Sequence, residues 1–393
     1  MTIYADNAAT TKMSDTVLAA MYKTMKEDYG NPSSLHHIGQ RAKEILEAAR
    51  EEVAKSINAS PREIYFTSGG SEADNQAIVT AAKIGAKAGK KHIITSKFEH
   101  HAVLHTLDAL KKEGFEVTYL DVYENGIVRT QDLKNAIRPD TCLVSVMAVN
   151  NEVGTIQPIK EIGHLCRENK ILFHTDAVQA LGHIPLDVED MNIDLLCVSA
   201  HKLHGPKGIG ALYCRRGIPL SNVIYGGAQE RGKRAGTENL PAVAGFAAAA
   251  KEACEKLDEN IRYISSLRDR LTDGVKDIEK IKINGDLNHH SSCTVNMCFE
   301  GIEGESLILL LDQKSICASS GSACTSGSLD PSHVLLAMGV PVENAHGSLR
   351  ISFSEYNTAD EVDYIVASIK STVAYLRSIS PVWEAIQKEE VNR

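Results

Sequence analysis

Short apolar runs alternate with segments of helical periodicity between about residues 60 and 215. The apolar runs are rich in β-branched residues, and we expect them to be strands. They span residues 63–67, 91–96, 116–122, 141–149, 170–176 and 194–200. Helical patterns at 72–87, 101–113 and 159–170 separate most of these runs. The alternation predicts an α/β fold with a mostly parallel sheet covered by helices.

The pattern changes outside this block. Helical periodicity precedes it after Ser14 and over about 38–57, and a long helical pattern runs from Pro241 towards Gly274. Further candidates are strands at 294–300 and 348–354, a helix at 304–314, and a last helix opened by the capping box at 358–361. Strands and helices in this order predict a smaller α+β domain. We expect a large domain over 15–258 and a small one built from 1–14 and 259–393.

Composition narrows the class of protein. The 393 residues carry a net charge of -9, which disfavours nucleic acid or an anionic membrane as a direct partner. No apolar run reaches the roughly 20 residues of a membrane span, and the start MTIYADNAATTK does not resemble a signal peptide. The nine cysteines show no disulfide or zinc spacing. These features predict a cytoplasmic protein.

Three candidate chemical groups follow three of the predicted strands. Lys202 lies in SAHKLHGPKG just beyond a strand, where an amine of lowered pKa forms Schiff bases. A glycine turn with Gly70 and Ser71 opens a helix, where backbone N–H groups and a hydroxyl would hold a phosphate. Asp176 ends another strand, and a carboxylate there would keep a pyridine nitrogen protonated. Together the three predict a pyridoxal phosphate site at one edge of the sheet.

Taken singly, these residues also fit ordinary structural roles. Lys202 would be a solvated loop lysine, Ser71 a helix cap and Asp176 a turn cap. The glycine turn matches neither GxGxxG nor a Walker sequence, which disfavours a nucleotide. His101 and His105 are spaced i, i+4, but without a third ligand they do not predict a metal site.

One cysteine lies in a segment with almost nothing apolar to pack. The stretch SSGSACTSGS, residues 319–328, holds Cys324 among small residues. Free cysteines are usually buried. This one is therefore either an unreactive linker thiol or a group that must move to react. Cys317 lies nearer the apolar side of the segment and is expected to be packed.

Several stretches occur in a fixed order from residue 4 to about 354. They are YADNAATT, YGNPSSLH, FTSGGSEADN, FEHHAVL, VNNEVGTIQPI, HTDAVQALG, SAHKLHGPKGIGALY, GGAQERGKRAGTEN, SSGSACTSGS and SLRISFS. Jointly they resemble the pyridoxal-phosphate-dependent cysteine desulfurases of the NifS/IscS type, in the class V aminotransferase group. The resemblance implies a fold type I transferase with a seven-stranded type of sheet. It also implies a smaller domain that carries the cysteine loop, about 317–331.

The resemblance implies a role for each matching residue. Lys202 would bind the cofactor as a Schiff base, and His100 would stack on its ring and handle protons. Asp176 would pair with the ring nitrogen, and Cys324 would be the catalytic nucleophile. Asn151 and Gln179 would contact the phenolic oxygen of the cofactor.

Other positions would bind the phosphate and the substrate. The phosphate would be held by Gly70, Ser71, Ser199 and His201. Thr237 of a neighbouring subunit would complete this cup, which implies a homodimer with shared active sites. Arg350 would clamp the carboxylate of the substrate, and Asn31 would lie close to it.

The implied activity converts L-cysteine to L-alanine and transfers the sulfur to Cys324 as a persulfide. An acceptor protein would then take the sulfur for iron–sulfur cluster assembly or tRNA thiolation. One alternative is a selenocysteine lyase or another class V enzyme, such as an aminotransferase, which would need no thiol. Another is a non-catalytic partner in sulfur assembly, which the presence of Lys202 disfavours.

Overall fold

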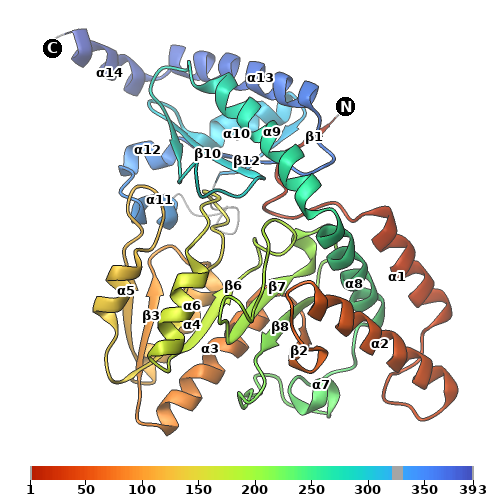
Figure 1. The fold of residues 1–393 in the computed structure, drawn as a ribbon. Helices are drawn as coiled ribbons and strands as arrows, with labels where there is room; N and C mark the ends of the chain where they lie inside the picture. Colours follow the sequence, from red (N-terminus) through yellow and green to blue (C-terminus); the bar gives the residue numbers. More distant parts are fainter. Residues whose placement is uncertain (1, 321–330, 392–393) are drawn as a thin grey trace.

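A seven-stranded sheet forms the centre of the larger part of the molecule (Figure 1). The computed structural model describes residues 2–320 and 331–391. The strand order is β2-β8-β7-β6-β5-β3-β4. The strands are β2 (Ile64–Thr67), β3 (His92–Ser96), β4 (Glu116–Leu120), β5 (Thr141–Ser145), β6 (Leu172–Asp176), β7 (Leu195–Ser199) and β8 (Gly210–Cys214). Strand β8 runs antiparallel to β2 and β7, and the other pairs are parallel, so the predicted mostly parallel sheet is confirmed.

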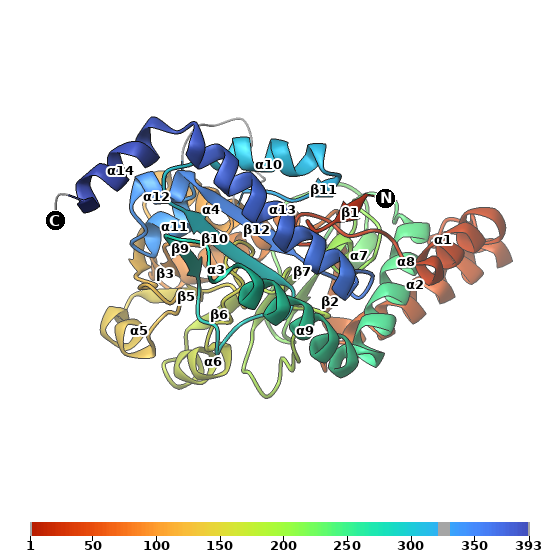
Figure 2. The same cartoon turned by 90° about the horizontal axis from the view of Figure 1, so that it is seen from above.

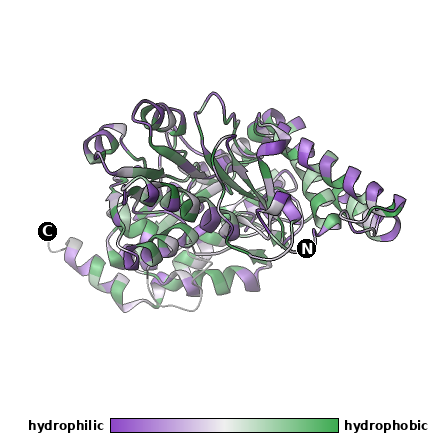
Figure 3. Ribbon diagram, turned by 90° about the horizontal axis from the view of Figure 1, so that it is seen from below, coloured by the Kyte–Doolittle hydropathy of each residue, from purple (hydrophilic) through white to green (hydrophobic). Residues whose placement is uncertain are grey.

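Both faces of this sheet are buried, because alternate residues of its strands enter two separate apolar clusters. In β7, Leu195 and Cys197 pack in the cluster that includes α3 (Gly70–Lys87) and α4 (His101–Lys112). Leu196 and Val198 pack in the cluster that includes α6 (Ile159–Glu168) and α8 (Leu240–Glu255). Successive strand side chains point to opposite faces, which explains the continuous apolar runs in the sequence. Figure 3 shows these hydrophobic strands inside, with hydrophilic residues along the outer helices.

Two N-terminal helices form a corner beside α8 (Figure 1). They are α1 (Asp15–Glu27) and α2 (His37–Lys55), close to the predicted bounds. The other helices of this part are α5 (Thr130–Ala136) and α7 (Gln229–Gly232). Short 3₁₀ turns lie at Pro61–Glu63 and Ala200–Lys202.

The last third of the chain builds a second sheet (Figure 2). Its strands, in the order β12-β10-β9, are β9 (Ile281–Asn284), β10 (Thr294–Phe299) and β12 (Ser348–Ser352), all antiparallel to their neighbours. The helices are α9 (Leu257–Val275), α10 (Gly304–Gln313), α11 (His333–Ala337), α12 (Val342–His346), α13 (Ala359–Ser378) and α14 (Pro381–Val391). The capping box predicted at Thr358 and Glu361 begins α13. The predicted α+β character of this part is therefore confirmed.

The N-terminal segment belongs to this second part. Strand β1 (Ile3–Tyr4) pairs in parallel with β11 (Ile316–Cys317), and Asp6 bridges to Ser352 on β12. Ile3 and Ala5 lie in an apolar cluster whose other members come from residues 264–376. This arrangement agrees with the expected division of the chain, whose boundaries at 14/15 and 258/259 stay a prediction.

One element differs from its prediction. The helical pattern from Pro241 towards Gly274 forms two helices, α8 and α9, which meet at Lys256. Helix α8 packs on α1 and α2, whereas α9 packs on α13. The chain must change direction between these two helices because they pack on different helices. Nothing in the sequence indicates this change, since there is no glycine or proline near residue 256.

Candidate active site

The carboxyl ends of the parallel strands border a cavity of about 370 Å³. Ten of the predicted site residues line it. They are Gly70, Ser71, His100, Asn151, Asp176, Gln179, Ser199, His201, Lys202 and Arg350. The cavity is also lined by Ala8 and Ala9, so the N-terminal segment forms part of its wall.

Lys202 follows β7 in the 3₁₀ turn Ala200–Lys202. Its Nζ donates hydrogen bonds to the carbonyl oxygens of Ala8 at 2.5 Å and Ala9 at 2.9 Å. The lysine is therefore held at the cavity wall by the N-terminal segment. An amine on the wall of a cavity at a strand end is suited to covalent chemistry with a carbonyl group.

The glycine turn lies between the end of β2 at Thr67 and the start of α3 at Gly70. A side chain at Gly210 would place its Cβ 2.8 Å from the Cα of Gly69. Strand β8 can therefore pack directly against the glycine turn only because residue 210 is glycine. Ser71 and Ser199 line the adjoining cavity. Backbone N–H groups at the start of a long helix, with two hydroxyls, are suited to an anionic group.

His201 completes this part of the wall. Burial, followed by the charges of Lys202 and Lys207, lowers the pKa of His201 to about 4. Its Nδ1 lies 3.1 Å from the hydroxyl of Thr10. The imidazole is therefore neutral at pH 7 and acts through hydrogen bonds rather than charge.

Asp176 ends β6 on the cavity wall and is buried. It accepts a hydrogen bond of 2.9 Å from Val178 N. A second buried carboxyl, that of Asp74 on α3, also lines the cavity and has an oxygen within 4.8 Å of one from Asp176. Burial raises the pKa of Asp74 to about 7; burial and then the charge of Asp74 raise that of Asp176 to about 6. A cationic partner at this end of the cavity would favour the ionised form of Asp176.

The raised pKa of Asp74 predicts how the free energy of unfolding depends on pH. Between the unfolded value of 3.8 and the folded value of about 7, the unfolded chain loses a proton that the folded chain keeps, so this group lowers stability as pH rises. Replacing Asp74 by asparagine removes that loss. We compare the unfolding free energies of Asp74→Asn and wild type at each pH. We expect the advantage of the variant to grow by about 2 kcal/mol as the pH rises from about 5 to about 7.

Urea unfolding measures this gain. The cofactor-free protein is used because bound cofactor would itself add to the measured stability. The matched control is Asp273→Asn on α9, where the side chain is largely exposed. An unchanged pH dependence in Asp74→Asn would show that the buried carboxyl does not titrate in this range.

His100 caps the start of α4. Its Nδ1 accepts a hydrogen bond of 3.1 Å from Ala102 N, so the neutral ring carries its proton on Nε2. The ring is half-buried and lines the cavity. A helix cap that fixes both the tautomer and the ring position suits an imidazole that stacks on a planar ligand.

Arg350, Asn151 and Gln179 complete the lining. Arg350 lies on β12 of the second sheet and donates a 2.9 Å hydrogen bond from Nη1 to the carbonyl oxygen of Asn151. Gln179 follows β6 and donates to the carbonyl oxygen of Ala8 at 2.9 Å. Residues from both sheets and from the N-terminal segment therefore meet at one cavity.

This set of groups fits pyridoxal phosphate. The cavity offers an amine (Lys202), a buried carboxyl (Asp176) and an imidazole that caps a helix (His100). Two serine hydroxyls lie beside a helix N-terminus, as an anionic phosphate requires. Each functional group of the cofactor would find a side chain of matching chemistry.

Two predicted residues are not brought to the cavity of the chain. Asn31 is exposed, and its Oδ1 accepts a hydrogen bond from Ser33 N at 2.9 Å. Thr237 is also exposed, and neither residue lines the cavity. Cys324 lies outside the described residues. Cys317, which was expected to be packed, is only half-buried; burial followed by the charges of Asp312 and Asp6 raises the pKa of its thiol.

Sequence reasoning missed several residues at the site. Asp74 and Glu152 line the cavity, and Asp6 accepts a hydrogen bond from Arg350. All three lie in quoted motifs (FTSGGSEADN, VNNEVGTIQPI and YADNAATT), but no role was given to them. The position of Asp74 four residues after Gly70 was the available signal, because it places both on one face of α3.

No helix in the described ranges 2–320 and 331–391 is long and apolar enough to cross a bilayer. The family model for class-V aminotransferases matches residues 3–365. The chain is 52% identical over 391 residues to the cysteine desulfurase IscS of Clostridium botulinum (strain Hall), covering 99% of this chain and 98% of that protein. It is 52% identical to the IscS of Methanosarcina thermophila, covering 97% and 94%.

A solved structure of a NifS-like protein has the same fold, with a TM-score of 0.90 and 41% sequence identity. The match covers 96% of this chain and 100% of that one. Fold, cavity and these similarities agree over nearly the full length. The chain therefore belongs to the class-V aminotransferase family of fold type I, in its group of pyridoxal-phosphate-dependent cysteine desulfurases.

Proposed function

We propose that the chain converts L-cysteine to L-alanine at this cavity and keeps the sulfur on Cys324 as a persulfide. The observation that carries the proposal is that Lys202, Asp176 and Arg350 line one cavity, although they come from different strands and from both sheets. An amine, a carboxylate and a guanidinium so placed match the three parts of the reaction: proton removal, cofactor binding and recognition of the substrate carboxylate.

The residues of the chain would divide the work of binding as follows. Arg350 would bind the carboxylate of L-cysteine, and Asp176 would hold the ring nitrogen of the cofactor. Ser71, Ser199 and His201 would bind its phosphate. His100 would lie against the ring of the cofactor. Asn151 and Gln179 would contact the phenolic oxygen, and Gly70 would let the phosphate approach the start of α3.

When bound, pyridoxal phosphate supplies the electron sink that allows the Cα proton of L-cysteine to be removed. Lys202 would take that proton, since its amine lies at the cavity wall. The thiolate of Cys324 would then attack the sulfur of the substrate. A bond forms between the two sulfurs, and the Cβ–S bond breaks with its electron pair left on Cβ. Protonation of Cβ and return of a proton to Cα, for which the Lys202 amine is the available donor, give L-alanine, and Cys324 carries the sulfur.

The direct test is to measure alanine and sulfide formed from L-cysteine by the purified protein with a reductant present. Equal amounts of both products support the proposal. An aminotransferase would instead give a keto acid in place of alanine, and sulfide would not be released. An acceptor protein for iron–sulfur assembly or tRNA thiolation is expected to replace the reductant in the cell. Location in the cytoplasm stays a prediction.

We also propose a homodimer with shared sites. A second depression shares Gly70, Ser71, Ser199 and His201 with the cavity, so the phosphate end of the site is open on another side. Thr237 is exposed on its own chain and would fill this opening on a partner chain. Large exposed apolar residues, including Tyr29, Leu35 and Tyr225, provide surface for such an association.

Replacing Thr237 by alanine is expected to weaken the affinity for pyridoxal phosphate about tenfold, the size of one lost hydrogen bond to a charged group. Fluorescence titration of the cofactor-free protein measures the affinity, and sedimentation measures the number of chains. The control is Thr272→Ala on α9, whose hydroxyl bonds to Asp269 O away from the cavity. A monomer that binds the cofactor at full strength would contradict the shared site.

A further inference from the structure

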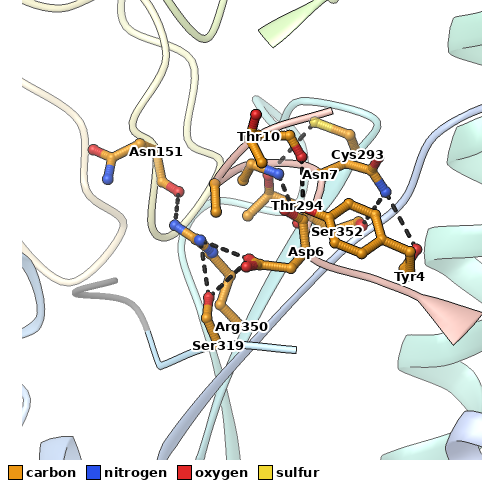
Figure 4. A network of polar contacts seen from close by, with 12 residues as sticks. Tyr4, Asp6, Asn7, Thr10, Asn151, Cys293, Thr294, Ser319, Arg350 and Ser352 are labelled. Carbon is orange, nitrogen blue, oxygen red and sulfur yellow. Dashed lines mark hydrogen bonds and ion pairs between the residues drawn. The ribbon is translucent and has the colours of Figure 1, made fainter. Parts of the chain in front are cut away.

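The guanidinium of Arg350 is fixed by three hydrogen bonds of equal length (Figure 4). Nη1 donates to the carbonyl oxygen of Asn151, and Nη2 donates to both Asp6 Oδ1 and Ser319 Oγ, each at 2.9 Å. The Arg350 side chain is 2% exposed. A guanidinium is planar and its donors have fixed directions, so these contacts define one orientation of the group.

Asp6 contacts both Arg350 and the neighbouring Ser319. Its Oδ1 accepts one hydrogen bond from Arg350 Nη2 and another from the hydroxyl of Ser319, also at 2.9 Å (Figure 4). Both donors use the same oxygen atom. The contact therefore depends on an oxygen acceptor at this point and does not require both oxygens of a carboxylate.

Backbone pairing places the members of this group. Asp6 bridges to Ser352, which lies two residues after Arg350 and therefore on the same face of β12. Ser319 pairs with Arg350 itself, through hydrogen bonds in both directions between their backbones. The orientation of Asp6 toward Arg350 is thus built into two strand-like pairings.

Asp6 contacts Arg350 but does not line the cavity. Arg350 and Asn151 line the cavity, whereas neither Asp6 nor Ser319 is part of its lining. A residue so placed reaches a bound substrate only through the guanidinium. The side chain of Asp6 is 19% exposed, so it forms a partly buried ion pair with an arginine that is almost fully buried.

We propose that Asp6 is a positioning residue for substrate binding: its Oδ1 fixes the orientation in which Arg350 meets the α-carboxylate of L-cysteine. The inference rests on the proposed role of Arg350. Without the Asp6 oxygen, Nη2 and the Ser319 hydroxyl lose their shared acceptor, and only the bonds to Asn151 and Ser319 still hold the guanidinium. Asp6 and Ser319 use both N–H groups of Nη2, so the donors left for a carboxylate are the second N–H of Nη1 and the buried Nε–H, which has no partner in the described residues.

Charge and position make opposite predictions for the loss of Asp6. If Asp6 mattered only as a negative charge near the site, its removal would strengthen binding of an anionic carboxylate. If it positions Arg350, removal weakens that binding. Asparagine separates the two effects, because it keeps the oxygen acceptor and removes the charge.

The test measures dissociation constants of the holoenzyme for L-alanine, from the absorbance change of the cofactor, and for L-alaninamide, which lacks the carboxylate. We expect Asp6→Ala to weaken L-alanine binding about tenfold and to leave L-alaninamide binding unchanged within about twofold. Asp6→Asn is expected to bind L-alanine within about threefold of wild type. The control Asp363→Ala removes a carboxylate that pairs with Arg270 on the surface, and it should change neither constant.

Equal weakening of both ligands in Asp6→Ala would indicate a general structural role and overturn the proposal. Unchanged or tighter L-alanine binding would overturn it in favour of a simple charge effect. Weak binding in Asp6→Asn as well would show that the oxygen acceptor is insufficient. Melting temperatures of the cofactor-free variants verify that each is folded.

Arg350→Ala distinguishes failure of this inference from failure of the proposed function. If Arg350→Ala leaves L-alanine binding intact, Arg350 does not bind the carboxylate and its proposed role is wrong. If Arg350→Ala weakens binding but Asp6→Ala does not, only the positioning role of Asp6 is lost.

Discussion

Replacing Lys202 by alanine is expected to lower the release of alanine and sulfide from L-cysteine by about 10³-fold or more. The amine has two tasks in the proposed reaction, since it binds the cofactor covalently and takes the Cα proton. No other lysine lines the cavity within the described residues. The carbonyl oxygens of Ala8 and Ala9, which hold Nζ, cannot take over either task because they do not bind protons near pH 7.

Initial rates of alanine formation in saturating cofactor measure the effect. Lys160→Ala is a suitable control, because this lysine pairs with Asp190 on the surface. Arginine at position 202 should not restore activity, since a guanidinium keeps its proton and does not form a Schiff base. More than about a tenth of wild-type activity in Lys202→Ala would exclude the lysine as the essential base.

Replacing Cys324 by alanine is expected to abolish sulfide release while substrate binding is retained. The thiolate is needed only when sulfur leaves the substrate, whereas the cofactor and L-cysteine meet before that step. The expected loss is about 10³-fold or more in sulfide formation. The absorbance change on mixing with L-cysteine should persist in this variant, and mass spectrometry of wild type should find one added sulfur on Cys324.

Cys317 provides the matched control for this experiment. It lies seven positions earlier, in β11, where its backbone pairs with that of Tyr4. Burial raises the pKa of its thiol, which keeps it protonated and a poor nucleophile at neutral pH. Cys317→Ala should therefore keep sulfide release within about twofold of wild type. Full activity in Cys324→Ala, or its loss in Cys317→Ala, would contradict the assignment.

The fold could be predicted wherever a local pattern was strong. Strand β7 is apolar over residues 195–198 because both of its faces are buried, and the run at 194–200 in the sequence shows this directly. Strands β8 and β9 were missed. The first follows a glycine-rich loop, and the second has only four residues, IKIN, with a lysine in the middle. Their strand conformation depends on pairing: β9 pairs with the next strand β10, and β8 pairs with β7 and with the distant β2.

Some residues of the candidate site could be predicted from local sequence patterns, and others could not. Lys202, Asp176 and Ser71 follow strands, so general rules for parallel sheets place them together. Arg350 lies inside a strand of the second sheet, and its prediction depended on resemblance to a family. Asp6 had no local signal, because its partners at positions 319 and 350 are brought to it only by the pairing of the N-terminal segment.

That pairing has a consequence for the order of events during protein synthesis. Residues 3–7 leave the ribosome long before their partners at 316–317, 319, 350 and 352. Strands of the large sheet from β2 to β8 can pair while the rest of the chain is still being made. The backbone N–H of Ala8 also donates to the hydroxyl of Ser352, so this segment is held on both of its sides only after β12 has been synthesised. A nascent chain stalled before residue 350 would therefore carry a folded sheet but an incomplete wall around its lysine.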